Sequence, residues 1–146
     1  MLKGGSNHPD KNDNNVVLID FGYASRFQDK DGKHIKQHEV ESFKGNILFA
    51  SIDQLDFQSA TRKSDLISIC YMLIFMLNDL DLPLQPKDDT NDIGDLFESQ
   101  IKYKKGVSFS RMIKELDQFH GNTLGKQLTV FCEEINQLGF YDQPDY

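Results

Sequence analysis

The sequence has little positive charge, few cysteines and no long hydrophobic run, and each shortage excludes a class of protein. Sixteen Lys and Arg face 23 Asp and Glu, which gives a net charge of -7, so no excess of cations is available for a nucleic-acid backbone or an anionic membrane. Two cysteines allow one disulfide at most, and with no secretory leader they favour the reducing cytoplasm or nucleus. The longest apolar run, residues 66–77, is interrupted by Ser68 and is too short to cross a bilayer. We expect a soluble protein with no nucleic-acid or membrane partner.

The apolar residues that are present suffice for one hydrophobic core. They make up 38% of the 146 residues and include eleven Phe and five Tyr, which suits a single domain of this length. Residues 4–15 are rich in Gly, Asn and Asp and predict a loop. Residues 16–19 are apolar and β-branched and predict a short buried strand, with residues 1–3 as its hairpin partner. Residues 23–49 show no sustained period and predict an extended, exposed segment.

Helical patterns dominate the second half of the chain. Thr61 or Ser64 is positioned to cap a helix through residues 65–77, whose apolar side chains occupy nearly every face. Such a helix is expected at the centre of the core. Three further stretches have helical character: residues 97–105, 111–119 and 124–138. The predicted fold class is mainly α (α+β), with a short N-terminal β-hairpin and about four helices around a central buried helix.

Three local patterns suggest ligands, but each also has a simpler interpretation. Residues 10–14 have the alternating oxygen ligands of a calcium loop but lack its Gly and its closing Glu, which favours a solvated turn. His34 and His38 have the spacing of two metal ligands on a helix, yet no third ligand completes a zinc set. Surface histidines are therefore favoured. A small basic cluster indicates either a solvated face or an anion contact; it consists of Lys102, Lys104 and Lys105.

The tripeptide Asp20-Phe21-Gly22 follows the predicted strand and suggests more specific chemistry. An Asp at the end of a strand, followed by an apolar side chain and a flexible Gly, can present its carboxylate to a magnesium ion held by nucleotide phosphates. Taken alone, these three residues favour the simpler interpretation, a turn with a capping Asp at the end of a strand. The surrounding sequence has to decide between the two interpretations.

The order of four segments resembles the C-terminal lobe of eukaryotic protein kinases, most closely the casein kinase I family. LIDFGYA at residues 18–24 is followed by FKGNILFASI at 43–52, where most kinases have Ala-Pro-Glu and this family has its own variant. RKSDLISICY at 62–71 begins the apolar helix, and FYDQPDY at 140–146 is similar to the Glu-x-Pro-Asp-Tyr stretch of the family. The resemblance covers essentially the whole chain, and the conjunction is more specific than any single motif.

The resemblance implies a domain layout and a nucleotide site. Asp20 is implied to chelate magnesium, with Phe21 packing beneath it and Gly22 completing the cofactor-binding tripeptide. Residues 1–146 would form a partial kinase domain that begins just after the catalytic loop. Its parts would be a hairpin and loop at 1–19, the magnesium motif and activation segment at 20–52, and a helical subdomain at 61–146.

The resemblance also implies roles outside the nucleotide site. Gly45 and Asn46 would belong to the loop that faces the substrate acceptor. Lys104 and Lys105 lie where the family has basic residues that help to bind an anion. Asp65 matches a structural carboxylate that accepts backbone hydrogen bonds from the catalytic loop.

The function implied is ATP- and Mg-dependent phosphorylation of protein Ser or Thr. Within the 146 residues we find no Gly-rich loop, no ATP-binding Lys and no His-Arg-Asp catalytic loop. Leu48 also replaces an Arg of the family, which removes a bidentate phosphate partner, and Cys70 replaces a Gly. We therefore expect a fragment of a Ser/Thr kinase that is inactive and binds no nucleotide as this chain.

Two alternatives to a kinase fragment remain at this point. The chain could be a non-catalytic, pseudokinase-like module that uses its helical lobe to bind or regulate a protein partner. It could also be a degenerate remnant with no function of its own. The pattern gives no indication of the oligomeric state or of the substrate.

Overall fold

The computed structural model describes residues 16–82 and 93–146, and within them the fold is mainly helical, as predicted. The expected loop at 4–15 and the hairpin partner at 1–3 lie outside the described residues. In chain order the elements are α1 (Ile52–Leu55), α2 (Arg62–Leu77), α3 (Ile93–Gly106), α4 (Phe109–Lys114), the 3-10 turn η1 (Asp117–Phe119) and α5 (Thr123–Gln137).

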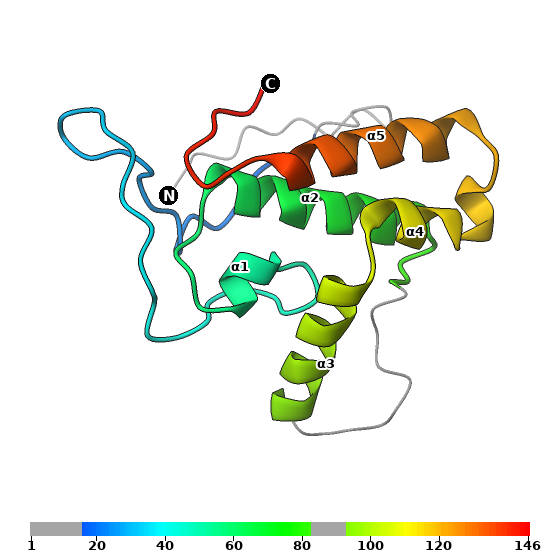
Figure 1. Ribbon diagram of the computed structural model, residues 1–146, viewed down its shortest axis with the longest axis horizontal. Coiled ribbons are helices and arrows are strands. Elements are labelled where there is room, and N and C mark those ends of the chain that lie inside the picture. Colours follow the sequence, from blue (N-terminus) through cyan, green and yellow to red (C-terminus); the bar gives the residue numbers. More distant parts are fainter. Residues whose placement is uncertain (1–15, 83–92) are drawn as a thin grey trace, which may run out of the picture.

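In Figure 1, α2 and α5 run side by side, with α4 and η1 connecting α3 to α5 beyond the C-terminal end of α2. α1 and α3 lie on the other side of α2 and contact each other. Residues 16–50 form an open loop along one side of the helices (Figure 1), and the described part of this loop contains isolated bridges but no strand. The prediction of an extended segment after Gly22 is confirmed.

The predicted buried strand at residues 16–19 is wrong. These residues have no strand partner among the described residues, and Val16 is 97% and Ile19 77% exposed. A run of β-branched residues forms a strand only where a neighbouring strand and an apolar layer cover it. Neither is present in the described ranges, so the local preference alone does not determine the structure.

Helix α2 begins where its side-chain cap is placed. The Oγ1 atom of Thr61 accepts a hydrogen bond from the backbone N–H of Ser64 at 3.1 Å, which satisfies one of the unpaired donors of the first turn. Ser64 is fully buried inside the helix. Of the two predicted caps, Thr61 is therefore the actual one, and the helix starts three residues earlier than the apolar pattern indicated.

Side-chain caps and one extended residue determine where the later helices begin and end. The stretch 111–119, expected as one helix, consists of α4 and η1, because Leu116 has an extended backbone between them. Ser108 caps α4 through the N–H of Arg111, and Asn122 caps α5 through the N–H of Gly125 at 2.7 Å. Each cap is a short polar side chain directly before the first helical residue, as the physics of helix ends requires.

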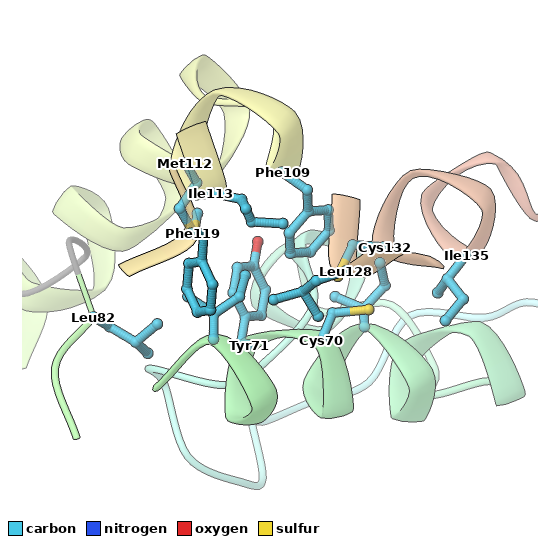
Figure 2. Packing of buried hydrophobic residues seen from close by; sticks show 12 residues of the cluster. Cys70, Tyr71, Leu82, Phe109, Met112, Ile113, Phe119, Leu128, Cys132 and Ile135 are labelled. Carbon is cyan, nitrogen blue, oxygen red and sulfur yellow. The ribbon is translucent and has the colours of Figure 1, made fainter. Parts of the chain in front are cut away.

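The hydrophobic core lies between α2 and the pair α4–α5. Figure 2 shows Cys70 and Tyr71 of α2 facing Phe109 of α4 and Cys132 of α5. Each large apolar side chain buried in this way contributes about 1.5–3 kcal/mol to stability. Twelve buried residues form the cluster: Ile67, Cys70, Tyr71, Ile74, Leu82, Phe109, Met112, Ile113, Phe119, Leu128, Cys132 and Ile135.

The expectation that α2 is buried on every face is only half met. One face supplies the core, but Ile69, Met72 and Met76 on the other side are 42%, 43% and 60% exposed. No helix in the described ranges combines the length and the apolar character needed to cross a membrane.

Candidate functional site

The predicted magnesium ligand Asp20 lies in a tight turn at the edge of the molecule. Its backbone has a φ of 60°, a conformation that Asp tolerates better than most residues, and its Oδ1 accepts the N–H of Gly22 at 3.2 Å. Asp20 is exposed, and Phe21 is 64% exposed rather than packed beneath it. The carboxylate is accessible to an ion, whereas the described residues do not support the implied packing of Phe21.

Gly22 and Asp65, far apart in the sequence, line the same cavity. This cavity has a volume of about 820 Å3 and lies between the activation segment and the start of α2. Ser59 and Phe140 also contribute to its wall. The structure thus brings the segment after the magnesium motif next to the carboxylate that the resemblance marks as structural.

The Asp65 carboxylate has no hydrogen-bond or ion-pair partner within the described residues. Asp65 is exposed as a residue, but partial desolvation at the cavity wall raises its pKa, because a carboxylate that loses solvent without gaining donors is destabilised in its charged form. A group in this condition is an acceptor for backbone N–H donors that enter the cavity. The structural role of Asp65 stays a prediction, because the described residues include no donor for its carboxylate.

His34 does not form a metal site with His38. The Nδ1 atom of His34 lies 2.8 Å from the Ile35 carbonyl oxygen, and Nδ1 of His38 lies 3.0 Å from that of Lys36. Within the described ranges no cluster of three or more His, Cys, Asp or Glu could hold a metal ion. His38 is exposed, as expected for a surface histidine, whereas His34 is half-buried.

Aromatic contacts of His34 connect the activation segment to the C-terminal segment. Its ring lies 5.9 Å from that of Phe27 and 5.2 Å from those of Phe140 and Tyr141. Arg62, at the start of α2, covers the Phe27 ring at 4.6 Å and donates to the Tyr141 carbonyl at 3.3 Å. These contacts fix one wall of the cavity, since edge-to-face rings and cation–π pairs both favour defined geometry.

Gly45 and Asn46 open a compact turn directly before α1. Gly45 has a φ of 139°, which favours glycine. The Asn46 carbonyl oxygen accepts the N–H groups of Phe49 at 3.2 Å and Ala50 at 3.0 Å, and its Oδ1 accepts that of Leu48 at 2.8 Å. We call residues 46–50 the Asn46 turn. It presents a fixed backbone shape next to the start of α1.

Lys104 is not available to an external anion. It is only 4% exposed, and its Nζ donates to the carbonyl oxygens of Ile47 at 3.1 Å, Leu48 at 2.9 Å and Ala50 at 2.7 Å. A lysine ammonium has three donors, so all of them are used within the protein. This geometry does not support the predicted anion contact.

Lys105 is already paired as well. Its Nζ lies 2.7 Å from a carboxylate oxygen of Asp56 at the end of α1, and both side chains are about half exposed, so the pair contributes little stability. An anion would have to compete with Asp56 for this ammonium group. Two lysines of the basic cluster, Lys104 and Lys105, therefore connect the end of α3 to the preceding segment.

Sequence reasoning missed the internal role of Lys104 because a lysine is normally placed on a solvated face. The available signal was helical spacing. Gln100 and Lys104 are four residues apart in α3 and are both buried, at 0% and 4% exposure, so they share the inner face of the helix. Tyr71 lies below this face, with Nζ of Lys104 4.3 Å from its ring centroid.

The known proteins that are similar to this chain are serine/threonine kinases and casein kinase I homologues. The chain is similar to serine/threonine-protein kinase spe-6 of Caenorhabditis elegans, with 26% identity over 93% of this chain and 34% of the relative. It is similar over its whole length to casein kinase I homolog 1 of Saccharomyces cerevisiae, at 29% identity, and to homolog 3, at 24%. No protein-family model matches the chain.

These comparisons confirm the resemblance seen in the sequence: casein kinase I homologues match this chain from end to end. The chain spans about a quarter to a third of the length of these relatives. The activity of these relatives therefore belongs to proteins much longer than this chain.

Proposed function

We propose that this chain forms the C-terminal-lobe part of a casein kinase I-like serine/threonine kinase. The complete kinase would transfer the γ-phosphoryl group of ATP to a serine or threonine of a protein. The single observation that carries the proposal is the shared cavity of Gly22 and Asp65. It adjoins a magnesium-type tripeptide on one side and an apolar helix on the other, in the order that the resemblance requires.

Asp20 is proposed as a magnesium ligand, with Phe21 and Gly22 shaping the turn that carries it. Its exposed carboxylate suits a hard cation, but one carboxylate is not a complete site. The other ligands would come from the nucleotide phosphates and from the rest of the kinase. When bound, magnesium neutralises phosphate charge during transfer. Gly45 and Asn46 would face the acceptor, and Asp65 would hold backbone N–H groups of the catalytic loop.

The 146 residues alone are expected to give no thermal shift with Mg-ATP. Stabilisation by a ligand requires binding to the folded state, and a lone carboxylate cannot position a triphosphate without a Gly-rich loop and its lysine. We expect a shift of less than about 1 °C at millimolar Mg-ATP, near the limit of detection for weak binding. Thermal melts with and without Mg-ATP test this, and a shift of several degrees would show that this chain holds nucleotide by itself.

The kinase assignment is tested on the longest product of the gene that contains these residues. We expect this product to transfer labelled γ-phosphate to a protein substrate, and Asp20→Asn to reduce kcat by about 100-fold or more, since it removes charge stabilisation at the phosphates. Asp31→Asn, in the exposed loop of the activation segment, is the matched control and should retain activity. A product that transfers no phosphate, or an Asp20→Asn variant as active as the control, contradicts the proposal.

The exposed face of α2 favours a second candidate function, a non-catalytic docking module. Ile69, Met72 and Met76 form an uncovered apolar stripe in the described structure, and such stripes are typical of protein contacts. In this case Met72→Glu would abolish partner binding, whereas Asp20→Asn would leave it intact. Asp20→Asn therefore distinguishes the two candidates, because the kinase candidate expects this variant to lose its activity.

A further inference from the structure

Two groups hold the Asn46 turn by hydrogen bonds. Asn46 belongs to the turn itself, and Lys104 lies outside it. Asn46 accepts the backbone N–H groups of residues 48–50, as described above. The carbonyl oxygens of the same turn are held by Lys104, which is more than 50 residues further along the chain and belongs to α3. The donors of the turn are thus fixed locally, while its acceptors depend on one distant side chain.

The three carbonyl contacts require the charged form of Lys104. An ammonium group has three N–H donors, whereas a neutral amine has two and a hydrocarbon side chain has none. The Tyr71 ring, 4.3 Å from Nζ, also attracts the cation and not the amine. The positive charge, rather than the length of the side chain, is what matches this arrangement.

We propose that Lys104 is a positioning residue whose ammonium group fixes the shape of the Asn46 turn, and that loss of its positive charge releases the turn. The inference rests on the proposed function only for the statement that this turn faces the acceptor. The contact itself is independent of any kinase activity. Its tests therefore measure the turn and not phosphate transfer.

Among residues 16–82 and 93–146, no carboxylate forms an ion pair with Lys104. A cavity of about 610 Å3 beside it is lined by charged groups from α1 to α4, of which Lys105 is paired with Asp56, and Arg111 with Glu115 at 2.8 Å. Tyr71 and Tyr103 stay neutral, because burial raises the pKa of both phenols. Two charged groups in the cavity wall have no such ion pair: Asp53 of α1 and Lys63 of α2.

This environment makes the charge of Lys104 sensitive to pH. Burial lowers its pKa from the ordinary 10.5 to about 7, while the carbonyl oxygens and the Tyr71 ring act in the opposite direction because they bind the ammonium form. Between these two pKa values the unfolded chain holds a proton that the folded chain has released. The free energy of unfolding therefore rises with pH above about 7, even though the turn loses one of its bonds.

Hydrogen exchange of the turn amides gives the first test. In Lys104→Met we expect the amides of residues 48–50 to exchange about 10-fold faster or more, because the turn opens locally. Lys102→Met is the matched control, since Lys102 is exposed on the same helix, and Lys104→Arg should restore part of the protection. Protected amides in α2 would show that the variants are folded. If turn protection is equal in Lys104→Met and Lys102→Met, the proposal is wrong.

A titration of the unaltered chain gives the second test and avoids any folding defect. The Cε resonance of Lys104, followed by NMR on 13C-labelled lysine, should titrate near pH 7, with Lys102 as an internal reference. The amide resonances of Leu48, Phe49 and Ala50 should move with the midpoint of Lys104. Amide resonances that do not shift as Lys104 titrates would overturn the inference and leave the kinase proposal untouched. An inactive full-length product would contradict the kinase proposal and leave the inference about Lys104 untouched.

Discussion

Replacing Gly125 by alanine is expected to lower the free energy of unfolding by about 3 kcal/mol, the upper range for overpacking a folded core. Gly125 lies in the first turn of α5, where an added Cβ atom would clash with the Phe119 carbonyl oxygen and would lie 2.8 Å from the Phe119 Cβ. Both atoms belong to a rigid turn whose aromatic side chain is buried in the core. Either Phe119 leaves the core or α5 shifts away from it. For a chain of this size the expected fall in Tm is about 10 °C.

Gly106→Ala is the matched control, because nothing lies within 4 Å of the Cβ position at Gly106, the last residue of α3. Alanine has the higher helix propensity, so this change should be neutral or stabilise by up to about 1 kcal/mol. Urea unfolding followed by circular dichroism at the helix band measures both variants. Equal stability of the two would mean that η1 does not pack against the start of α5.

Ile74→Ala is expected to cost about 3 kcal/mol, in the middle of the range for truncating a buried aliphatic side chain. Ile74 is fully buried in the α2 face that meets the core cluster. Truncation removes apolar contact area and leaves a cavity. The helices around it are held by their other core contacts and cannot move in to fill it. The loss of stability should appear as a lower urea midpoint with little change in slope.

Met76→Ala in the same helix provides the comparison. Met76 is 60% exposed, so its truncation should change the free energy of unfolding by less than about 0.5 kcal/mol. Both substitutions introduce the same residue into α2, and helix propensity is therefore nearly matched. Equal losses in the two variants would contradict the orientation of α2 described here.

The helices could be predicted from the sequence because local signals and burial agree in them. Thr61 has the side chain of a cap, and the residues after it have the composition of a helix, so α2 was found with an error of a few residues at its start. Residues 16–19 have an equally clear local preference for strand, but the described part of the chain supplies no partner for them. A strand depends on neighbours in a way that a helix does not, which explains why one prediction was confirmed and the other was wrong.

The site could be predicted only as a set of residue types. The motif order pointed to Gly22 and Asp65, and the structure places both at one cavity. The role of Lys104 depends on the path of the backbone at residues 47–50, whose carbonyl groups carry no sequence information at all. Helical spacing in α3 could have suggested that Lys104 lies on the inner face of the helix, but it could not have revealed that Lys104 binds these carbonyl groups, so this part of the site required coordinates.

The reactivity of Cys70 and Cys132 reports how often α2 and α5 separate. Both are free and fully buried where α2 meets α5 (Figure 2). The hydrogen bond that the Cys132 thiol donates to Cys70, together with burial, raises the pKa of Cys132. Thiolate is the reactive species, so an alkylating reagent can modify these sulfurs only after the two helices separate. The rate of alkylation therefore measures how often the interface between α2 and α5 opens, and no cysteine has to be introduced for the measurement.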